Sequence, residues 1–86
     1  MGLFGFGKKK QAGPSPEEQA QIQAFIADLK SEDAKVRLAA CEGLLAKAEV
    51  AAAAAPALLD LIDDPDGDVC LAASSALTEI QRFDGN

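Results

Sequence analysis

The chain has 86 residues, which is enough for one small domain, and it contains no histidine. The lack of histidine removes the commonest general base and a favoured metal ligand. The net charge is −6, and every acidic side chain lies from Glu17 onward. An acidic body repels a phosphate backbone, so we expect no nucleic-acid partner.

The first sixteen residues, MGLFGFGKKKQAGPSP, are rich in glycine, lysine and proline and have no sustained hydrophobic period. We therefore predict a flexible N-terminal arm over 1–16. Its apolar part is short and precedes the lysines at 8–10, which is the wrong order for a secretory signal. No apolar run in the chain is long enough to span a bilayer. We expect a soluble, cytoplasmic protein.

A second interpretation of the arm gives it a binding role. Leu3, Phe4 and Phe6 would insert into a partner or a membrane surface, and the lysines that follow would meet anionic groups. We favour a disordered terminus over membrane contact, because three large side chains supply little membrane affinity on their own.

The first helix is predicted over 16–30. Ser15 is a good N-cap, Pro16 suits the first helical position, and Glu18 completes a capping box. One apolar face follows at helical spacing, formed by Ile22, Phe25, Ile26 and Leu29.

An internal repeat defines the other helices. FIADLKSEDAKVRLAACEGLL, which starts at Phe25, aligns with LLDLIDDPDGDVCLAASSALT, which starts at Leu58, at an offset of 33 residues. Each copy predicts a helix, a short acidic turn and a second helix. The four helices are predicted at 16–30, 33–48, 51–63 and 66–82. Pro56 falls inside the third helix and is expected to bend it or to limit its first turn.

The stretch IDDPDGDVCLA, at the second acidic turn, allows two interpretations. Asp64, Asp66 and Asp68 alternate there, as they would in a calcium loop. Such a loop needs glycine at position 6 and a bidentate glutamate at position 12, but those places hold Val69 and Ser75. An aspartate N-cap with acids in the first turn fits better. We therefore predict a helix start and no metal site.

Matched apolar positions of the two copies predict one shared core. Its expected members are Leu29, Val36, Ala40, Leu44, Leu59, Ile62, Val69, Ala73, Leu77 and Ile80. Gly43 lies inside the second predicted helix. A glycine there costs about 1 kcal/mol relative to alanine, so close helix packing is the expected reason for it.

A helical pair with the pattern L-x-D-x-D-x-x-V-R-x-x-A-x-x-A-L across its turn resembles the HEAT repeats, in particular the HEAT-like repeats of the phycobilisome lyase family. The matching residues are Leu29, Asp33, Val36, Arg37, Ala40 and Leu44 in the first copy and Ile62, Asp64, Pro65, Asp66, Val69, Ala73, Ala76 and Leu77 in the second. The resemblance implies a short α-α superhelix (solenoid) of two helical hairpins over 17–83, with a tail at 84–86.

The resemblance also implies a ladder in which a turn aspartate pairs with an arginine of a neighbouring unit. Ser31 and Cys70 replace the first copy's leading aspartate and the second copy's arginine. Only Arg37 and Asp64 remain to form one rung, a structural role between the two units.

We expect a non-catalytic protein–protein interaction module without a cofactor, and not an enzyme. In stacked helical pairs the second helices line the concave face, where partners commonly bind. The residues expected on that face are Lys35, Arg37, Leu38, Cys41, Glu42, Leu45, Asp68, Cys70, Leu71, Ser74, Ser75 and Thr78.

Other functions stay open at this point. The family resemblance allows an accessory subunit or lyase-like protein that acts on bilin chromophores, or one domain of a longer repeat array. Self-association through uncovered repeat ends is a further alternative to a partner protein. Cys41 and Cys70 could form a redox pair or half of a metal site, but we expect small apolar fillers because packed helices stand too far apart for a disulfide in most orientations.

Overall fold

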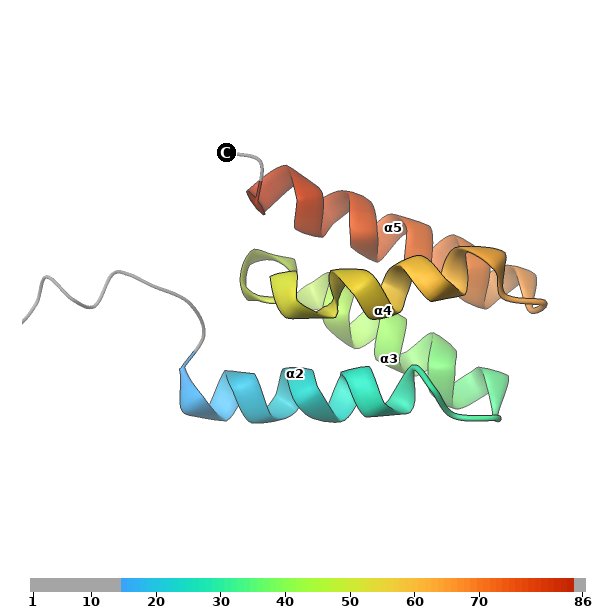
Figure 1. Cartoon of the computed structure of the whole chain (residues 1–86), viewed down its shortest axis with the longest axis horizontal. Coiled ribbons are helices and arrows are strands. Elements are labelled where there is room, and N and C mark those ends of the chain that lie inside the picture. The colour runs from blue at the N-terminus through green and yellow to red at the C-terminus, as the bar shows by residue number, and fades with distance from the viewer. Residues whose placement is uncertain (1–14, 85–86) are drawn as a thin grey trace, which may run out of the picture.

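A computed structural model describes residues 15–84, and these form helices joined by short turns, without a strand in that range (Figure 1). The elements in chain order are α2 (Pro16–Asp28), α3 (Ala34–Ala46), η1 (Ala48–Val50), η2 (Ala52–Ala54), α4 (Ala55–Asp60), η3 (Leu61–Asp63) and α5 (Gly67–Asp84), where η denotes a 3-10 helix. The chain runs back and forth, so that α2 pairs with α3, α4 pairs with α5, and α5 packs along α3. The prediction of an all-helical chain is confirmed for the described residues.

Local capping explains where three of the helices begin. The Ser15 hydroxyl accepts a hydrogen bond from the Glu18 backbone N–H, and the Glu18 side chain accepts one from the Ser15 N–H. This is the predicted capping box. Pro16, the last residue of the predicted arm, is the first residue of α2, and Ser15 is its N-cap. The rest of that arm lies outside the described residues.

The two acidic turns also act as helix starts. Asp33 caps α3 by accepting from the Lys35 N–H, and an Asp66 oxygen accepts from the N–H groups of Asp68 and Val69 at the start of α5. These bonds satisfy donors that the first helical turn leaves unpaired. The interpretation of the second turn as a helix start is therefore confirmed.

The third predicted helix, 51–63, is wrong as a continuous element. Pro56 has no N–H, so the hydrogen bond that an α-helix would make to the Ala52 carbonyl cannot form. The backbone before it makes tighter turns at η1 and η2, and α4 itself lasts only from Ala55 to Asp60 before η3 follows. The prediction that Pro56 limits this helix is confirmed, but the interruption is larger than a bend.

The core runs between all the helices, and nearly half of its buried side chains are alanine or cysteine. Of the predicted members, Leu29, Ala40, Leu44, Val69, Ala73, Leu77 and Ile80 are buried. Val36 and Ile62 are only half-buried. Leu59 is 55% exposed, so its assignment to the core was wrong. The buried positions of its segment are Ala51, Ala54, Leu58 and Leu61, at spacings of three and four, and Leu59 lies one position off that stripe.

Gly43 marks the close approach of α2 and α3. A Cβ atom added to Gly43 would overlap the ring of Phe25, a half-buried residue of α2 that packs against the core. The absence of a side chain at this position therefore lets the aromatic ring lie directly over the α3 backbone, as the sequence predicted.

Candidate functional site

The outer surface between α3 and α5 carries a shallow groove of about 330 Å³. Leu38, Glu42 and Leu45 line it from α3, and Asp68, Leu71, Ala72 and Ser75 line it from α5. We call this surface the α3–α5 groove. Its position follows from the packing of α5 along α3 (Figure 1), which leaves one stripe of each helix facing outward beside the contact.

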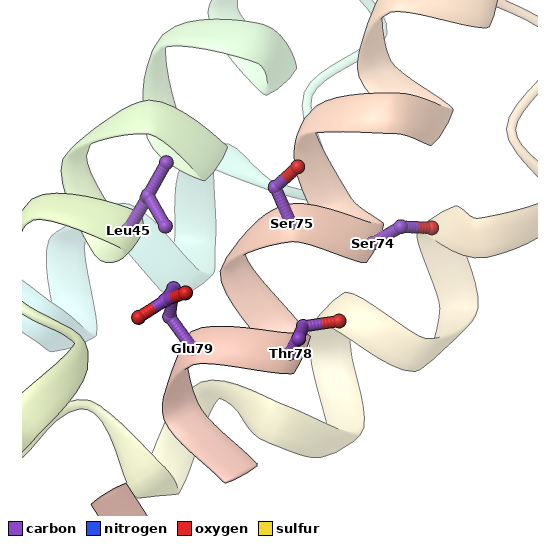
Figure 2. A pocket seen from close by; sticks show the side chains of 5 residues that line it. All are labelled: Leu45, Ser74, Ser75, Thr78 and Glu79. Atoms are coloured by element: carbon purple, nitrogen blue, oxygen red, sulfur yellow. The ribbon is translucent and has the colours of Figure 1, made fainter. Parts of the chain in front are cut away.

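A second hollow, of about 550 Å³, continues the groove along α5. Figure 2 shows Leu45 of α3 and the side chains of Ser75 and Glu79 on the side of α5 that faces it. Ser74 and Thr78 point to the other side of α5 in the same view. Leu45 and Ser75 line both hollows, so the two form one continuous surface.

The groove combines open apolar area with negative charge. Leu71 is 69% exposed, and Leu38 and Leu45 are half-buried against the core. The charged side chains that line the two hollows are Glu42, Asp68 and Glu79, all acidic. Glu79 also lies 3.3 Å from Arg82 of the next turn, whose side chain is largely exposed. The chemistry suits an apolar segment that carries positive charge.

Most of the residues predicted for partner binding do lie on or beside this groove. Lys35, Glu42, Asp68, Leu71, Ser75 and Thr78 are exposed, and Leu38 and Leu45 line the groove while half-buried. Ser74, also predicted for this face, lines the second hollow. Ala72 and Glu79 line the two hollows and were not among the residues predicted for the site. Glu79 was detectable, because it follows Leu71 and Ser75 at intervals of four residues on one face of a helix.

Three predicted contact residues face elsewhere. Cys41 is fully buried in the core, so its assignment to the binding face was wrong. Cys70 is half-buried, and its thiol donates a hydrogen bond to the Ile62 carbonyl oxygen at 2.8 Å, toward η3. The Arg37 side chain is 14% exposed and engages Asp64. The repeat alignment predicts only which face of a helix a residue lies on. It does not predict how closely α3 and α5 pack against each other.

Arg37 and Asp64 join three parts of the chain. One Arg37 terminal nitrogen donates to an Asp64 oxygen at 3.1 Å, and the other donates to the Ser31 carbonyl at 2.7 Å. The Nε atom lies 2.9 Å from the second Asp64 oxygen but is buried and makes no hydrogen bond, so it adds charge attraction only. The Asp64 side chain is 4% exposed. The ion pair thus connects α3 to the turns before α3 and before α5, a structural role.

Electrostatics around this pair shift two titratable groups. The Asp66 backbone N–H, which donates to Asp64 at 2.9 Å, outweighs burial and with the Arg37 guanidinium holds the pKa of Asp64 below its ordinary value. Burial raises the pKa of the Cys41 thiol to about 11; the charges of Asp64 and Glu42 add to this, and Arg37 opposes it. A buried, protonated thiol is a poor nucleophile.

The aspartates of the two acidic turns bond to backbone groups that lie close to them in the sequence. Asp33, Asp64 and Asp66 accept backbone hydrogen bonds at helix starts. Within residues 15–84, no cluster of three or more histidine, cysteine, aspartate or glutamate side chains has the arrangement of a metal site. No helix in the same range is long and apolar enough to cross a membrane.

Comparisons with family models, with curated proteins and with solved structures gave no match to this chain. The interpretation of the groove therefore rests on its own geometry and chemistry.

Proposed function

We propose that this chain is a non-catalytic protein-interaction module, a short HEAT-like solenoid of two helical hairpins, that binds a segment of a partner protein in the α3–α5 groove. The exposure of Leu71 beside half-buried Leu38 and Leu45 carries the proposal. Singly exposed leucines are ordinary on protein surfaces. Three leucines along one hollow between two packed helices offer the contiguous apolar area that a helix or an extended segment can cover.

The arrangement of the helices supports the HEAT-like interpretation. The Arg37–Asp64 ion pair joins α3 to the turn that precedes α5, the place where the resemblance implies a rung between units. Helical pairs that stack in this way use their second helices as a binding face. Here α3 and α5 are those second helices, and the groove lies between them.

The acidic side chains at the groove define the partner's chemistry. Glu42 and Asp68 flank the leucines, and Glu79 lies further along α5. A partner segment with large apolar side chains on one face and lysine or arginine beside them would pair with both features. Such charges chiefly raise the association rate and fix the register of the segment, while the apolar contacts supply the affinity.

A bilin-directed role ranks second. Cys41 is buried with a raised pKa, and the Cys70 thiol is engaged with a backbone carbonyl. Neither cysteine offers a free, activated nucleophile for chromophore attachment. Mixing the protein with a bilin and recording the visible spectrum tests this role, and a shifted absorption band would restore it.

Paired substitutions test the groove itself. Leu71→Ser removes the most exposed groove leucine, and Leu59→Ser removes a comparably exposed leucine on α4. Affinity capture from the native cell extract identifies the partner, and titration calorimetry then measures the affinity of each variant. We expect Leu71→Ser to weaken binding about 10- to 100-fold, from the loss of one buried leucine side chain. Leu59→Ser should bind as the parent protein does.

A charge pair completes the test. Glu42→Lys, in the groove, should weaken binding of the same partner. Glu32→Lys, on the exposed turn before α3, should leave that binding unchanged. Sedimentation at several concentrations should give one unchanged mass for all variants. A partner that binds equally to Leu71→Ser, or whose chemical-shift map avoids α3 and α5, would refute the proposal. A mass that falls on dilution would favour self-association through uncovered ends.

A further inference from the structure

The charge of this chain is divided between two segments of opposite character. Residues 15–84 hold all 14 acidic side chains and only five basic ones. Residues 1–14 hold three lysines and no acid, and they include Leu3, Phe4 and Phe6. The N-terminal segment therefore has the two features, large apolar side chains and adjacent positive charge, that the α3–α5 groove would select.

The end of the domain where α2 begins carries a cleft of about 440 Å³. Three carboxylates line it, from Glu18 in the first turn of α2, Glu49 in η1 and Glu79 in α5. Lys47 is the basic residue among its lining side chains, and Phe83, which is 48% exposed, forms part of its apolar wall. Figure 1 shows the start of α2, η1 and the end of α5 at one end of the molecule. We call this the end cleft.

The end cleft and the α3–α5 groove form one path. Leu45 and Glu79 line both the end cleft and the hollow of Figure 2. Leu45 and Ser75 continue from that hollow into the groove beside Leu71. The eight residues from Leu71 to Glu79 span about 12 Å of helix. The acidic end cleft therefore lies a short distance along α5 from the exposed leucines of the α3–α5 groove.

The order of residues along the N-terminal segment matches the order along this path. The segment joins α2 at Ser15, three residues before Glu18, so it meets the domain beside the end cleft. Lys10 is five residues from Ser15, a reach of about 17 Å in extended chain, and Phe4 is eleven residues away, a reach of about 38 Å. The lysines can therefore reach the carboxylates, and the apolar residues can extend to the leucines.

We propose that residues 1–14 fold back onto their own domain, with Lys8, Lys9 and Lys10 against the acidic end cleft and with Leu3, Phe4 and Phe6 over Leu45 and Leu71. This proposal rests on the proposed function in one respect: the segment occupies the groove assigned to the partner and competes with it. A partner must then displace an internal ligand whose local concentration is set by the short connection to α2.

Amide spectra of the full chain test the contact without any partner. In Lys8→Glu/Lys9→Glu the lysine half of the segment repels the end cleft, so we expect chemical-shift changes at Leu45, Glu49, Glu79 and Phe83. The control is Lys30→Glu, a charge reversal of an exposed lysine that lines neither the end cleft nor the α3–α5 groove. Its changes should stay near residue 30. High salt should move the parent spectrum toward that of Lys8→Glu/Lys9→Glu.

A second variant tests the apolar half of the contact. Phe4→Ser/Phe6→Ser should shift the amides of Leu71 and Ser75, at the far end of the path, and leave α2 unchanged. All these shifts should be independent of protein concentration. Changes confined to residues next to each substitution would overturn the proposal. So would shifts that vanish on dilution, which would indicate a second copy, and segment signals that respond only to anionic lipid vesicles, which would indicate a membrane.

The result is separable from the test of the proposed function. If the N-terminal variants leave the groove amides unchanged while Leu71→Ser still weakens partner binding, the fold-back is wrong and the partner site stands. If the groove amides shift but a partner binds elsewhere, the fold-back stands and the assignment of the partner to the groove is wrong.

Discussion

The contact between Gly43 and the Phe25 ring sets how closely α2 approaches α3, and it can be perturbed by one methyl group. Ile22 is the one residue between Pro16 and Asp28 that is fully buried, so α2 depends on a small contact area. A Cβ at Gly43 would overlap the Cζ and both Cε atoms of Phe25. Gly43→Ala must therefore push the ring outward or separate the two helices.

Two opposing terms give the expected size of the effect. Alanine is favoured over glycine inside a helix by about 1 kcal/mol. Forcing extra volume into a packed contact costs about 1–3 kcal/mol. We expect Gly43→Ala to leave the free energy of unfolding unchanged or to lower it by up to about 2 kcal/mol. Gly67→Ala is the control, because nothing lies within 4 Å of the added Cβ at the start of α5. It should stabilise by about 0.4–1 kcal/mol.

Urea unfolding of the full chain, followed by far-ultraviolet circular dichroism, measures both substitutions, and Phe25→Leu completes a double-mutant cycle. Leucine lacks the three ring atoms that meet the added Cβ, so Gly43→Ala should become stabilising in the Phe25→Leu background. The coupling energy should be about 1–3 kcal/mol. If Gly43→Ala stabilises the parent protein as much as Gly67→Ala does, or if the cycle is additive within about 0.5 kcal/mol, the packing argument fails.

Three further substitutions or titrations test the core and the electrostatics. Leu44→Ala should cost about 2–5 kcal/mol of unfolding free energy because Leu44 is fully buried, whereas Leu59→Ala, at an exposed site, should barely change the melting temperature. The lowered pKa of Asp64 stabilises the fold above the unfolded-state pKa, and this contribution is lost as pH falls through the folded-state pKa. The stability difference between the parent protein and Asp64→Asn should therefore shrink below about pH 4. Cys41 is buried and its pKa is raised to about 11, so a thiol reagent should modify half-buried Cys70 first. Cys41 should react only as the chain unfolds. Equal reaction rates of the two cysteines in the folded protein would contradict this.

Helix starts were predictable from the sequence because capping is local. Ser15 and Glu18 make a reciprocal pair of hydrogen bonds within one turn, and Asp66 bonds the N–H groups two and three residues after it. Nothing distant is needed for these contacts, so residue type and spacing were sufficient. Ser15 as N-cap and Pro16 as the first helical residue are both as predicted, so the helix starts one residue inside the range given to the arm, 1–16.

The segment between α3 and α5 was predicted less well because a nonlocal choice decides it. The alanines around Pro56 favour an α-helix, but Pro56 interrupts its hydrogen-bond ladder and the residues before it form 3-10 turns. In the folded chain Leu58 and Leu61 are buried in the core, and Leu59 is exposed. Hydropathy cannot distinguish adjacent leucines when the helical phase before them is unknown.

The residues of the proposed binding face were placed correctly to the level of the helices and less well for individual small side chains. Leu38, Leu45 and Leu71 lie where the second-helix face was expected. Cys41 does not, since a cysteine is small and apolar enough to fit a buried contact as well as an exposed one. Whether such a residue faces the core depends on how closely α3 and α5 pack, and one sequence does not report that distance.

Small side chains form the contact between α3 and α5, beside the groove. Ala40 and Cys41 of α3 and Ala73 and Ala76 of α5 are fully or almost fully buried, so the two helices meet through residues of little volume. Each alanine contributes less burial energy than a leucine would. Leu71 lies two residues from buried Val69 and two from buried Ala73, so helical geometry turns it away from the core and leaves its apolar area in the groove. A partner segment that covers this area should stabilise the fold by mass action, so the melting temperature should rise with the concentration of the partner.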